Sequence, residues 1–284
     1  MFNQNIKSPV NIPVSKIHPF EGNPYKVLDN DEMNSLICSI QEQGILTPII
    51  IRPIESTDEY EVISGHRRLH ATVKAGMKEV PAFIYAVSRD EAAIMLVDSN
   101  LHREHILPSE KAFAYKLKLD ALKHQGKTSA QVGQKWSVEQ VAEESSDSRS
   151  QIQRYIRLTY LIPELLELVD EEKIALTPAV ELSYLTDEEQ YSLLGTIEEE
   201  DRTPSLSQAV RFKKLSQAGE LSDESIETIM QEDKANQKPT VKFSVERLQK
   251  VAPKVKESDL ENFVMKACEH YYRYLLRQRD RDSR

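Results

Sequence analysis

The sequence predicts an α+β domain at the N-terminus, followed by an all-α domain and then a helical C-terminal segment. In the first hundred residues, short apolar runs that suit strands alternate with apolar residues at helical spacing, as in small α/β folds. From Pro108 onward only the helical spacings remain. The boundaries between the parts are expected at 1–105, 106–216, 217–239 and 240–284.

The N-terminal domain is predicted to open with an extended segment at 8–17 and to continue with three strands and three helices. Continuous apolar runs indicate buried strands, and alternating runs indicate strands with one exposed face. Gly44 and Gly76 directly follow two of the helical patterns, where glycine commonly ends a helix. The expected strands are 48–53, 59–64 and 80–87, and the expected helices are 31–43, 67–75 and 89–100.

The all-α domain is expected to begin with a helix between Pro108 and Gly126. Residues 217–239 are polar and acidic, which is typical of a linker. Beyond them, apolar residues recur at i, i+3 and i+4 from Leu260 to Leu276, enough for a helix that packs on a partner. We expect self-association there, and the alternative is a helix that folds back on its own domain. The all-α domain is expected to contain helices at 109–124, 137–144, 148–161, 163–170, 178–184, 187–199 and 205–216.

The composition narrows the class of protein. Cys38 and Cys268 are far apart and fit neither a disulfide scaffold nor a zinc module, so a reducing, cytoplasmic setting is expected. No apolar run approaches the ~20 residues that span a bilayer, and residues 1–20 lack a signal-peptide core, so no membrane partner is expected. The formal net charge of −9 by itself disfavours nucleic acid, which prefers a basic partner.

The negative charge is concentrated in one part of the chain. Residues 187–234 include 13 acidic and 5 basic side chains, whereas residues 240–284 include 11 basic and 7 acidic ones. The segment 148–161 contains three arginines and no acidic residue. Exposed charges are screened over about 10 Å at physiological salt, so the local patch governs phosphate binding. The net charge therefore does not exclude DNA.

Two short helices joined by small polar residues at 137–160 indicate a helix-turn-helix, the motif that places its second helix in the major groove. Ser137 suits the cap of the first helix, and Ile152 with Tyr155 gives the second helix a packing face. Glutamine pairs with adenine and arginine with guanine, while serines suit phosphate. The alternative is an ordinary helical hairpin with a solvated face. The predicted DNA-contacting residues are Ser148, Arg149, Ser150, Gln151, Gln153, Arg154 and Arg157.

Three stretches precede this motif: GILTPIIIR at 44–52, SGHRRLHA at 64–71 and DSNLHREHILPSEKAFAY at 98–115. Together with the helix-turn-helix they resemble the ParB family of DNA partition proteins, over roughly residues 10–215. The resemblance implies a ParB-type N-terminal domain, a helical DNA-binding domain and a dimerising tail. It also implies a role in the segregation of a plasmid, a mobile element or a chromosome.

Chromosomal members of that family bind CTP with Mg²⁺ and use it as a clamp switch. A glycine lets backbone N–H groups approach phosphate, and guanidinium groups clamp the phosphate oxygens. His66 and Ser99 stand where the family has glutamates, which counts against metal-dependent hydrolysis because hard cations prefer carboxylates. The resemblance implies that the nucleotide-binding residues are Gly65, His66, Arg67, Arg68, Asn100 and Arg103.

The sequence therefore predicts a DNA-binding partition protein that acts as a homodimer on double-stranded DNA, in the cytoplasm at a nucleoid or plasmid. The resemblance adds a partition ATPase as a further partner. At most weak CTPase activity is expected, with catalytic residues unassigned and no resident metal site. Nuclease activity is not expected, because no acidic metal cluster accompanies Gly65–Arg68. Two alternatives stay open: a ParB-like transcriptional regulator without a partition role, and an N-terminal phosphotransferase or nuclease.

Overall fold

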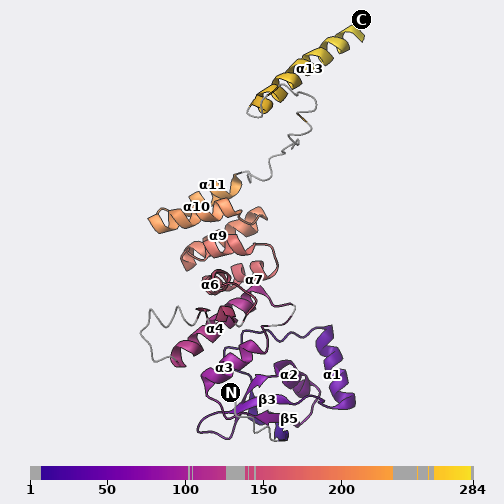
Figure 1. Ribbon diagram of the computed structural model, residues 1–284, viewed down its shortest axis with the longest axis vertical. Helices are drawn as coiled ribbons and strands as arrows, with labels where there is room; N and C mark the ends of the chain where they lie inside the picture. The colour runs from indigo at the N-terminus through magenta and orange to yellow at the C-terminus, as the bar shows by residue number, and fades with distance from the viewer. Residues whose placement is uncertain are drawn as a thin grey trace. The chain divides into compact units, whose positions relative to one another are not determined.

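The computed structural model divides the chain into two units, Met1–Glu232 and Asp233–Arg284, which are described separately (Figure 1). The predicted cap Ser137 and the predicted linker residues 233–239 lie outside the described residues. The structure describes residues 8–101, 103, 105–125, 138–139, 141–143, 145–232, 248, 255 and 259–282.

A five-stranded mixed sheet forms the centre of the N-terminal domain, with strand order β1-β5-β3-β4-β2. The antiparallel pairs are β1 with β5 and β3 with β4, and the parallel pairs are β3 with β5 and β2 with β4. Ile49, Ile51, Val62 and Val80 are fully buried, as their apolar runs predict. The three predicted strands are confirmed, and the extended segment contributes two short ones. The strands are β1 Val10–Pro13, β2 Ile17–His18, β3 Ile49–Pro53, β4 Tyr60–Ser64 and β5 Glu79–Ile84.

Three helices accompany the sheet, and all three were predicted. The side chain of Asn30 accepts a hydrogen bond from the Met33 backbone N–H at the start of the first helix, and Gly44 ends that helix with φ 71°. Ser88 and Glu91 form a reciprocal capping box at the start of the third. The helices are α1 Asp31–Gln43, α2 His66–Lys74 and α3 Arg89–Asp98.

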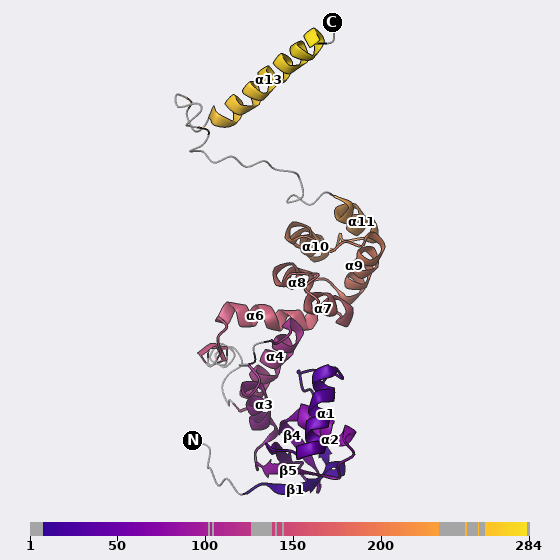
Figure 2. The same cartoon turned by 90° about the vertical axis from the view of Figure 1, so that its right-hand side faces the viewer.

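Helix α4, Pro108–Gln125, connects the N-terminal domain to the helical region. Its Ala114 and Ala121 pack with α3, its Tyr115 and Leu119 pack with Ile152 of the helix-turn-helix, and Ala112 belongs to a third cluster. Both Figure 1 and Figure 2 show α4 running between α3 and the helix labelled α6. One helix therefore supplies side chains to three hydrophobic cores.

The helical region beyond α4 buries a continuous core in which Leu158, Leu165, Leu182, Leu193 and Phe212 are fully buried. The predicted helices in this region are confirmed, with small shifts at their ends. The elements are α6 Arg149–Arg157, the 3₁₀ turn η2 Leu158–Tyr160, α7 Pro163–Asp170, α8 Leu176–Leu182, α9 Asp187–Glu200, α10 Leu206–Ala218 and α11 Asp223–Gln231.

The prediction of a linker across 217–239 is wrong for the residues of α11. Ile226, Ile229 and Met230 are buried in the core of the helical region, and the Gln208 side chain donates a hydrogen bond to the Ile229 carbonyl at 2.6 Å. The prediction relied on the acidic composition of the segment. It overlooked that these three apolar residues recur at helical spacing, which places them on one side of a helix. The acidic residues that begin the helix favour its positive N-terminal end.

The second unit contains α13, Leu260–Asp282. The large apolar and aromatic side chains described on it are exposed, so within this unit nothing described covers them. The expectation of self-association stays a prediction. None of the described helices is long and apolar enough to cross a membrane. The exposed side chains are Phe263, Met265, Tyr271, Tyr272 and Tyr274.

The burial of α11 gives a stability prediction. Ile226→Ala is expected to lower the free energy of unfolding by about 2–5 kcal/mol, because it removes buried methyl groups and leaves a cavity. The exposed neighbour change Glu227→Ala is expected to stay within about 0.5 kcal/mol. Urea denaturation followed by circular dichroism measures both. Equal stability of the two variants would mean that residues 223–231 do not pack on the core.

Candidate functional site

Polar residues from three segments of the N-terminal domain, together with Leu36 of α1, line a pocket of about 260 Å³. The six residues that the family resemblance assigns to nucleotide binding all lie on it, although they come from segments more than 30 positions apart. The loop before α1 adds lining residues that the sequence analysis missed. The lining consists of Asn23, Tyr25, Lys26, Val27, Leu36, Ser64, Gly65, His66, Arg67, Arg68, Ser99, Asn100 and Arg103.

Gly65 allows the backbone to enter this pocket. It adopts φ 105° and ψ 26°, and a Cβ atom at this position would lie 2.7 Å from Cγ2 of Ile49, closer than real side chains come. Gly65 also caps α2, whose first turn has neither a side-chain cap nor an acidic residue. The N–H groups at the start of α2 therefore present the positive end of a helix to the pocket, an arrangement that suits an anion.

Cationic side chains surround this helix end. Arg68 donates through Nη1 to the carbonyls of Thr47 and Pro48, the latter at 2.8 Å, and burial lowers the pKa of its guanidinium. Arg67 is more exposed and pairs with Glu32 at 3.1 Å. Arg103 lies 5.7 Å from the centre of the Tyr25 ring. The pocket thus gathers fixed positive charge and N–H donors, the groups that bind phosphate.

His66 serves the pocket as a neutral acceptor. Its Nε2 accepts a hydrogen bond from the Phe20 backbone N–H at 3.3 Å, which requires the tautomer with the proton on Nδ1. Burial, followed by the positive charge of Arg103, lowers the pKa of His66 to about 4. His66 is therefore uncharged at neutral pH and fixes the loop before α1 to the start of α2.

Lys26 links the pocket to the helical region, and no pattern in the sequence predicted this contact. Its Nζ lies 3.1 Å from Oδ2 of Asp170, the last residue of α7, and its backbone N–H donates to Oε1 of Glu110 in α4 at 2.9 Å. Ser109 donates to the same Asp170 carboxylate through its N–H and its hydroxyl. The pocket loop is thus bonded to two helices of the neighbouring region.

The pocket fits a phosphate group better than it fits a metal ion. Its lining contains no aspartate or glutamate, and the described residues include no group of three or more His, Cys, Asp or Glu side chains suited to a metal. Asp98 is not one of the lining residues, and it pairs with the fully buried Lys118 of α4. A Mg²⁺ ion carried by a nucleotide would meet hydroxyl and amide oxygens, from Ser64, Ser99 or Asn100, beside the phosphate oxygens.

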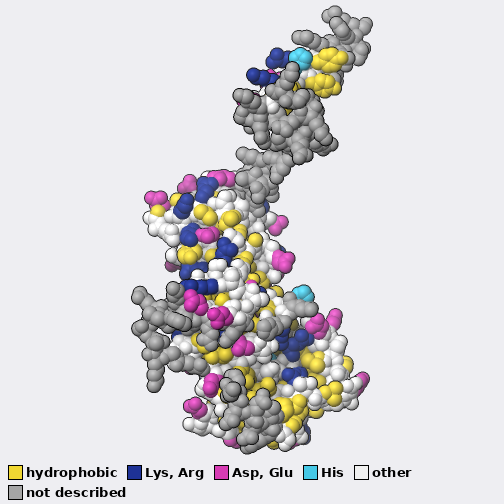
Figure 3. Space-filling model, in the orientation of Figure 1, with side chains coloured by type: hydrophobic (Ala, Val, Ile, Leu, Met, Phe, Trp, Pro, Cys, Tyr) yellow, Lys and Arg dark blue, Asp and Glu magenta, His cyan; other side chains and the backbone are white. Residues whose placement is uncertain are grey.

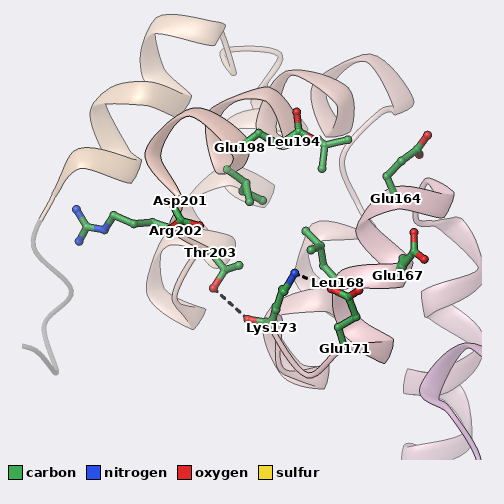
Figure 4. Close-up of a pocket in the computed structure, with 11 residues that line it drawn as sticks. Glu164, Glu167, Leu168, Glu171, Lys173, Leu194, Glu198, Asp201, Arg202 and Thr203 are labelled. Atoms are coloured by element: carbon green, nitrogen blue, oxygen red, sulfur yellow. Dashed lines mark hydrogen bonds and ion pairs between the residues drawn. The ribbon is translucent and has the colours of Figure 1, made fainter.

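A larger cavity of about 590 Å³ lies between α7 and α9 (Figure 4). Five carboxylates and two cations line this cavity, and the Lys173 ammonium pairs with the Glu171 carboxylate at 2.7 Å. This charge repels phosphate, so the larger cavity suits neither a nucleotide nor DNA. The carboxylates are Glu164, Glu167, Glu171, Glu198 and Asp201.

The second helix of the helix-turn-helix is α6, and its packing side is the one predicted. Ile152 is fully buried against Tyr115 and Val141, and Ser148 caps the helix by accepting a hydrogen bond from the Gln151 N–H at 3.3 Å. Of the seven predicted DNA-contacting residues, five are exposed and two, Gln151 and Arg157, are half-buried. The exposed ones are Ser148, Arg149, Ser150, Gln153 and Arg154.

Helix α4 fixes the turn that leads into α6. Asp147, in that turn, accepts hydrogen bonds from the Tyr115 hydroxyl at 2.6 Å and from Lys111 Nζ at 3.0 Å. Arg149 pairs with Glu139 of the preceding helix at 3.0 Å. Sequence reasoning missed Lys111, Tyr115 and Asp147, since a local pattern does not reveal contacts over 30 residues.

The buried state of His66 gives a pH prediction. The pKa of His66 is lower in the folded protein than in the unfolded chain, so the unfolded chain takes up a proton first as the pH falls below about 6.5. His66→Gln, which keeps an acceptor, is expected to weaken the loss of stability between pH 6.5 and pH 4. The expected difference in slope is at most about 1.4 kcal/mol per pH unit. Identical pH profiles of unfolding for both proteins would contradict the assignment.

Comparison with known proteins identifies two domain types along the chain. A family model described as the ParB N-terminal domain matches residues 3–101, and one described as the ParB HTH domain matches residues 107–205. The nucleoid occlusion protein of Listeria innocua is 32% identical over 197 residues, which cover 69% of this chain and 65% of that relative. The chain thus spans somewhat less than two thirds of that relative's length.

Two further proteins are similar. The chromosome-partitioning protein Spo0J of Thermus thermophilus is 32% identical over 202 residues, covering 71% of this chain and 70% of that relative. The C-terminally truncated chromosome-partitioning protein ParB of Caulobacter crescentus, solved in complex with the centromeric parS site, is 20% identical. The structural match covers 78% of this chain and 98% of the Caulobacter chain, with a TM-score of 0.42. With both domain types matched in their expected order and a relative matched over most of its length, the chain belongs to the ParB family.

Proposed function

We propose that this protein binds a specific DNA duplex through α6 and acts in the segregation of a plasmid, a mobile element or a chromosome. The observation that carries the proposal is the exposed face of α6, which bears arginine, glutamine and serine without any acidic residue. These side chains are the ones that read base edges and hold phosphates in the major groove. The names of the relatives, which are chromosome-partitioning and nucleoid occlusion proteins, support the same role.

The N-terminal pocket is proposed to hold the phosphates of a nucleotide, with CTP as the first choice because of the family resemblance. Gly65 opens the helix end, and Arg67, Arg68, Lys26 and Arg103 supply positive charge. Mg²⁺ is proposed to accompany the nucleotide, held mainly by its phosphate oxygens. The bound nucleotide would supply the charge that these groups clamp, and the N-terminal domain would regulate how the protein spreads on DNA.

The protein is further proposed to act as a homodimer, with each copy of α6 reading one half of a two-fold symmetric site. The exposed aromatic side chains of α13, among them Tyr271 and Tyr272, support self-association, because an isolated apolar stripe gains by burial against a second copy. A partition ATPase is the proposed further partner, and the nucleoid or a plasmid is the proposed location.

Arg154→Ala tests the assignment of α6. On a duplex that the wild-type protein selects from a random-sequence library, the change is expected to cost about 1–3 kcal/mol of binding, because a base-edge contact is lost. Fluorescence anisotropy on the selected duplex and on a scrambled duplex measures it, with Arg202→Ala beside the acidic cavity as the control. Failure of the wild-type protein to prefer any duplex would refute sequence-specific binding.

Arg67→Ala tests the pocket. Because the Arg67 side chain is 41% exposed and belongs to no hydrophobic core cluster, the fold should tolerate the change, and loss of a charge-assisted hydrogen bond is expected to weaken CTP binding about 10–100-fold. Equilibrium dialysis with labelled CTP, ATP and GTP, with and without Mg²⁺, measures the affinity. Arg89→Ala, an exposed arginine of α3 outside the pocket lining, is the matched control. Equal affinity of the two variants would remove the nucleotide from this pocket.

A further inference from the structure

A cluster of basic and aromatic side chains lies on the surface of the helical region. Its members come from α4, α6, η2, the residues just after α8, and α10. Among its members only Arg157 was predicted to touch DNA. We call this cluster the basic-aromatic platform, and it consists of Lys116, Arg157, Tyr160, Tyr184 and Lys213.

Cations and rings alternate across the platform. The guanidinium carbon of Arg157 lies 4.4 Å from the centre of the Tyr160 ring and 3.9 Å from that of Tyr184. Lys213 Nζ lies 3.7 Å from the Tyr184 ring, and Lys116 Nζ lies 5.6 Å from the Tyr160 ring. Tyr160 is 55% exposed and Tyr184 40% exposed. The rings thus hold three long cationic side chains in place at the surface.

Arg157 is anchored but keeps free donors. Its Nε donates to the Ser183 hydroxyl at 3.0 Å, and its Nη2 donates to the Ser183 carbonyl at 2.7 Å. A guanidinium carries five N–H groups, and three of those of Arg157 have no hydrogen-bond partner among the residues that the structure describes. These bonds place Arg157 as a fixed part of the platform and account for its half-buried state.

The platform carries net positive charge. Lys213 pairs with Glu181 at 2.9 Å, and both side chains are 24% exposed. Lys116 is exposed and makes no ion pair with the residues that the structure describes. Three cations and one carboxylate leave a net positive charge. Glu181 is already paired with Lys213, so the remaining charge favours binding of a polyanion. On the face shown in Figure 3, Lys and Arg side chains lie over α10 and toward α6, with Asp and Glu side chains among them.

The platform also continues the proposed reading face of α6. Arg157 follows Gln153 by four residues and Arg154 by three, so the three side chains share one side of the helix. When such a helix occupies the major groove, the surface beside it meets the sugar-phosphate backbone, where Lys, Arg and Tyr donate to phosphate oxygens.

We propose that the basic-aromatic platform binds the backbone phosphates that flank the base pairs read by α6. The proposal rests on the proposed DNA-binding function and adds, to the residues predicted on α6, side chains at the end of the helix-turn-helix and beside it that position the duplex. Tyr160 and Tyr184 donate through their hydroxyl groups, and Lys116, Arg157 and Lys213 supply charge. A contact of this kind adds affinity without sequence preference and orients α6 in the groove.

The test measures how DNA affinity depends on salt. Two 30-base-pair duplexes serve as probes, one selected by the wild-type protein from a random-sequence library and one scrambled. Lys116→Gln is expected to weaken binding equally on both and to reduce the slope of log affinity against log salt by about one unit, as for one lost phosphate contact. Tyr160→Phe, which keeps the ring and loses the hydroxyl, should weaken both duplexes equally.

A paired change tests the other end of the platform. Glu181→Gln with Lys213→Gln removes the ion pair without altering net charge, and it is expected to weaken binding on both duplexes by removing the contact that Lys213 gives. Lys173→Gln beside the acidic cavity makes the same charge change as Lys116→Gln and should leave the slope unaltered.

An unchanged salt slope for Lys116→Gln would overturn the proposal, and so would a loss confined to the selected duplex, which would indicate base reading. Both results are distinct from failure of the proposed function, because in that case the wild-type protein itself would show no preference between the two duplexes.

Discussion

The arrangement of the first unit depends on the bonds made by the carboxylate of Asp170, at the end of α7, to Ser109 of α4 and Lys26 of the pocket loop. This carboxylate is 7% exposed and accepts hydrogen bonds from the Ser109 N–H at 2.9 Å and from the Ser109 hydroxyl, while it pairs with Lys26 at 3.1 Å. A buried carboxylate is costly unless donors of this kind surround it. Asp170 belongs to α7, but its carboxylate accepts from the first turn of α4 and therefore also interacts with the positive end of that helix. The end of α7, the start of α4 and the pocket loop are therefore fixed relative to one another by one side chain.

Helix α4 transmits this arrangement to the proposed DNA-reading face. Its first turn holds the pocket loop through Glu110, and its next residues, Lys111 and Tyr115, hold Asp147 in the turn before α6. The same helix packs with α3 through Ala114 and Ala121 and with α6 through Tyr115 and Leu119, so α4 connects the N-terminal domain to α6. The orientation of α6 is thus set by polar bonds at the turn and by the apolar contact of Ile152 beneath it.

The parts of this molecule that could be predicted from the sequence are those that local patterns encode. Apolar runs and alternation predicted the strands β3, β4 and β5, and helical spacing followed by Gly44 predicted α1. Resemblance assigned Gly65 and Arg103 to one site, and both line the same pocket. Lys26 and Asp170 could not be paired, because 144 positions separate them and neither belongs to a motif. The burial of Ile226 and its apolar neighbours in α11 was missed because the composition of a segment averages its exposed acidic residues with its buried apolar ones.

The net charge of −9 and a DNA-binding role are compatible because the fold separates the charges in space. Five carboxylates gather around the cavity between α7 and α9, whereas the exposed face of α6 carries none. Screening limits each patch to about 10 Å, so the acidic cavity does not cancel the arginines of α6. It does reduce adsorption of the rest of the surface to DNA. The proposed DNA contact is then confined to α6 and the surface beside it, where Ser183 and two tyrosines hold Arg157 in place.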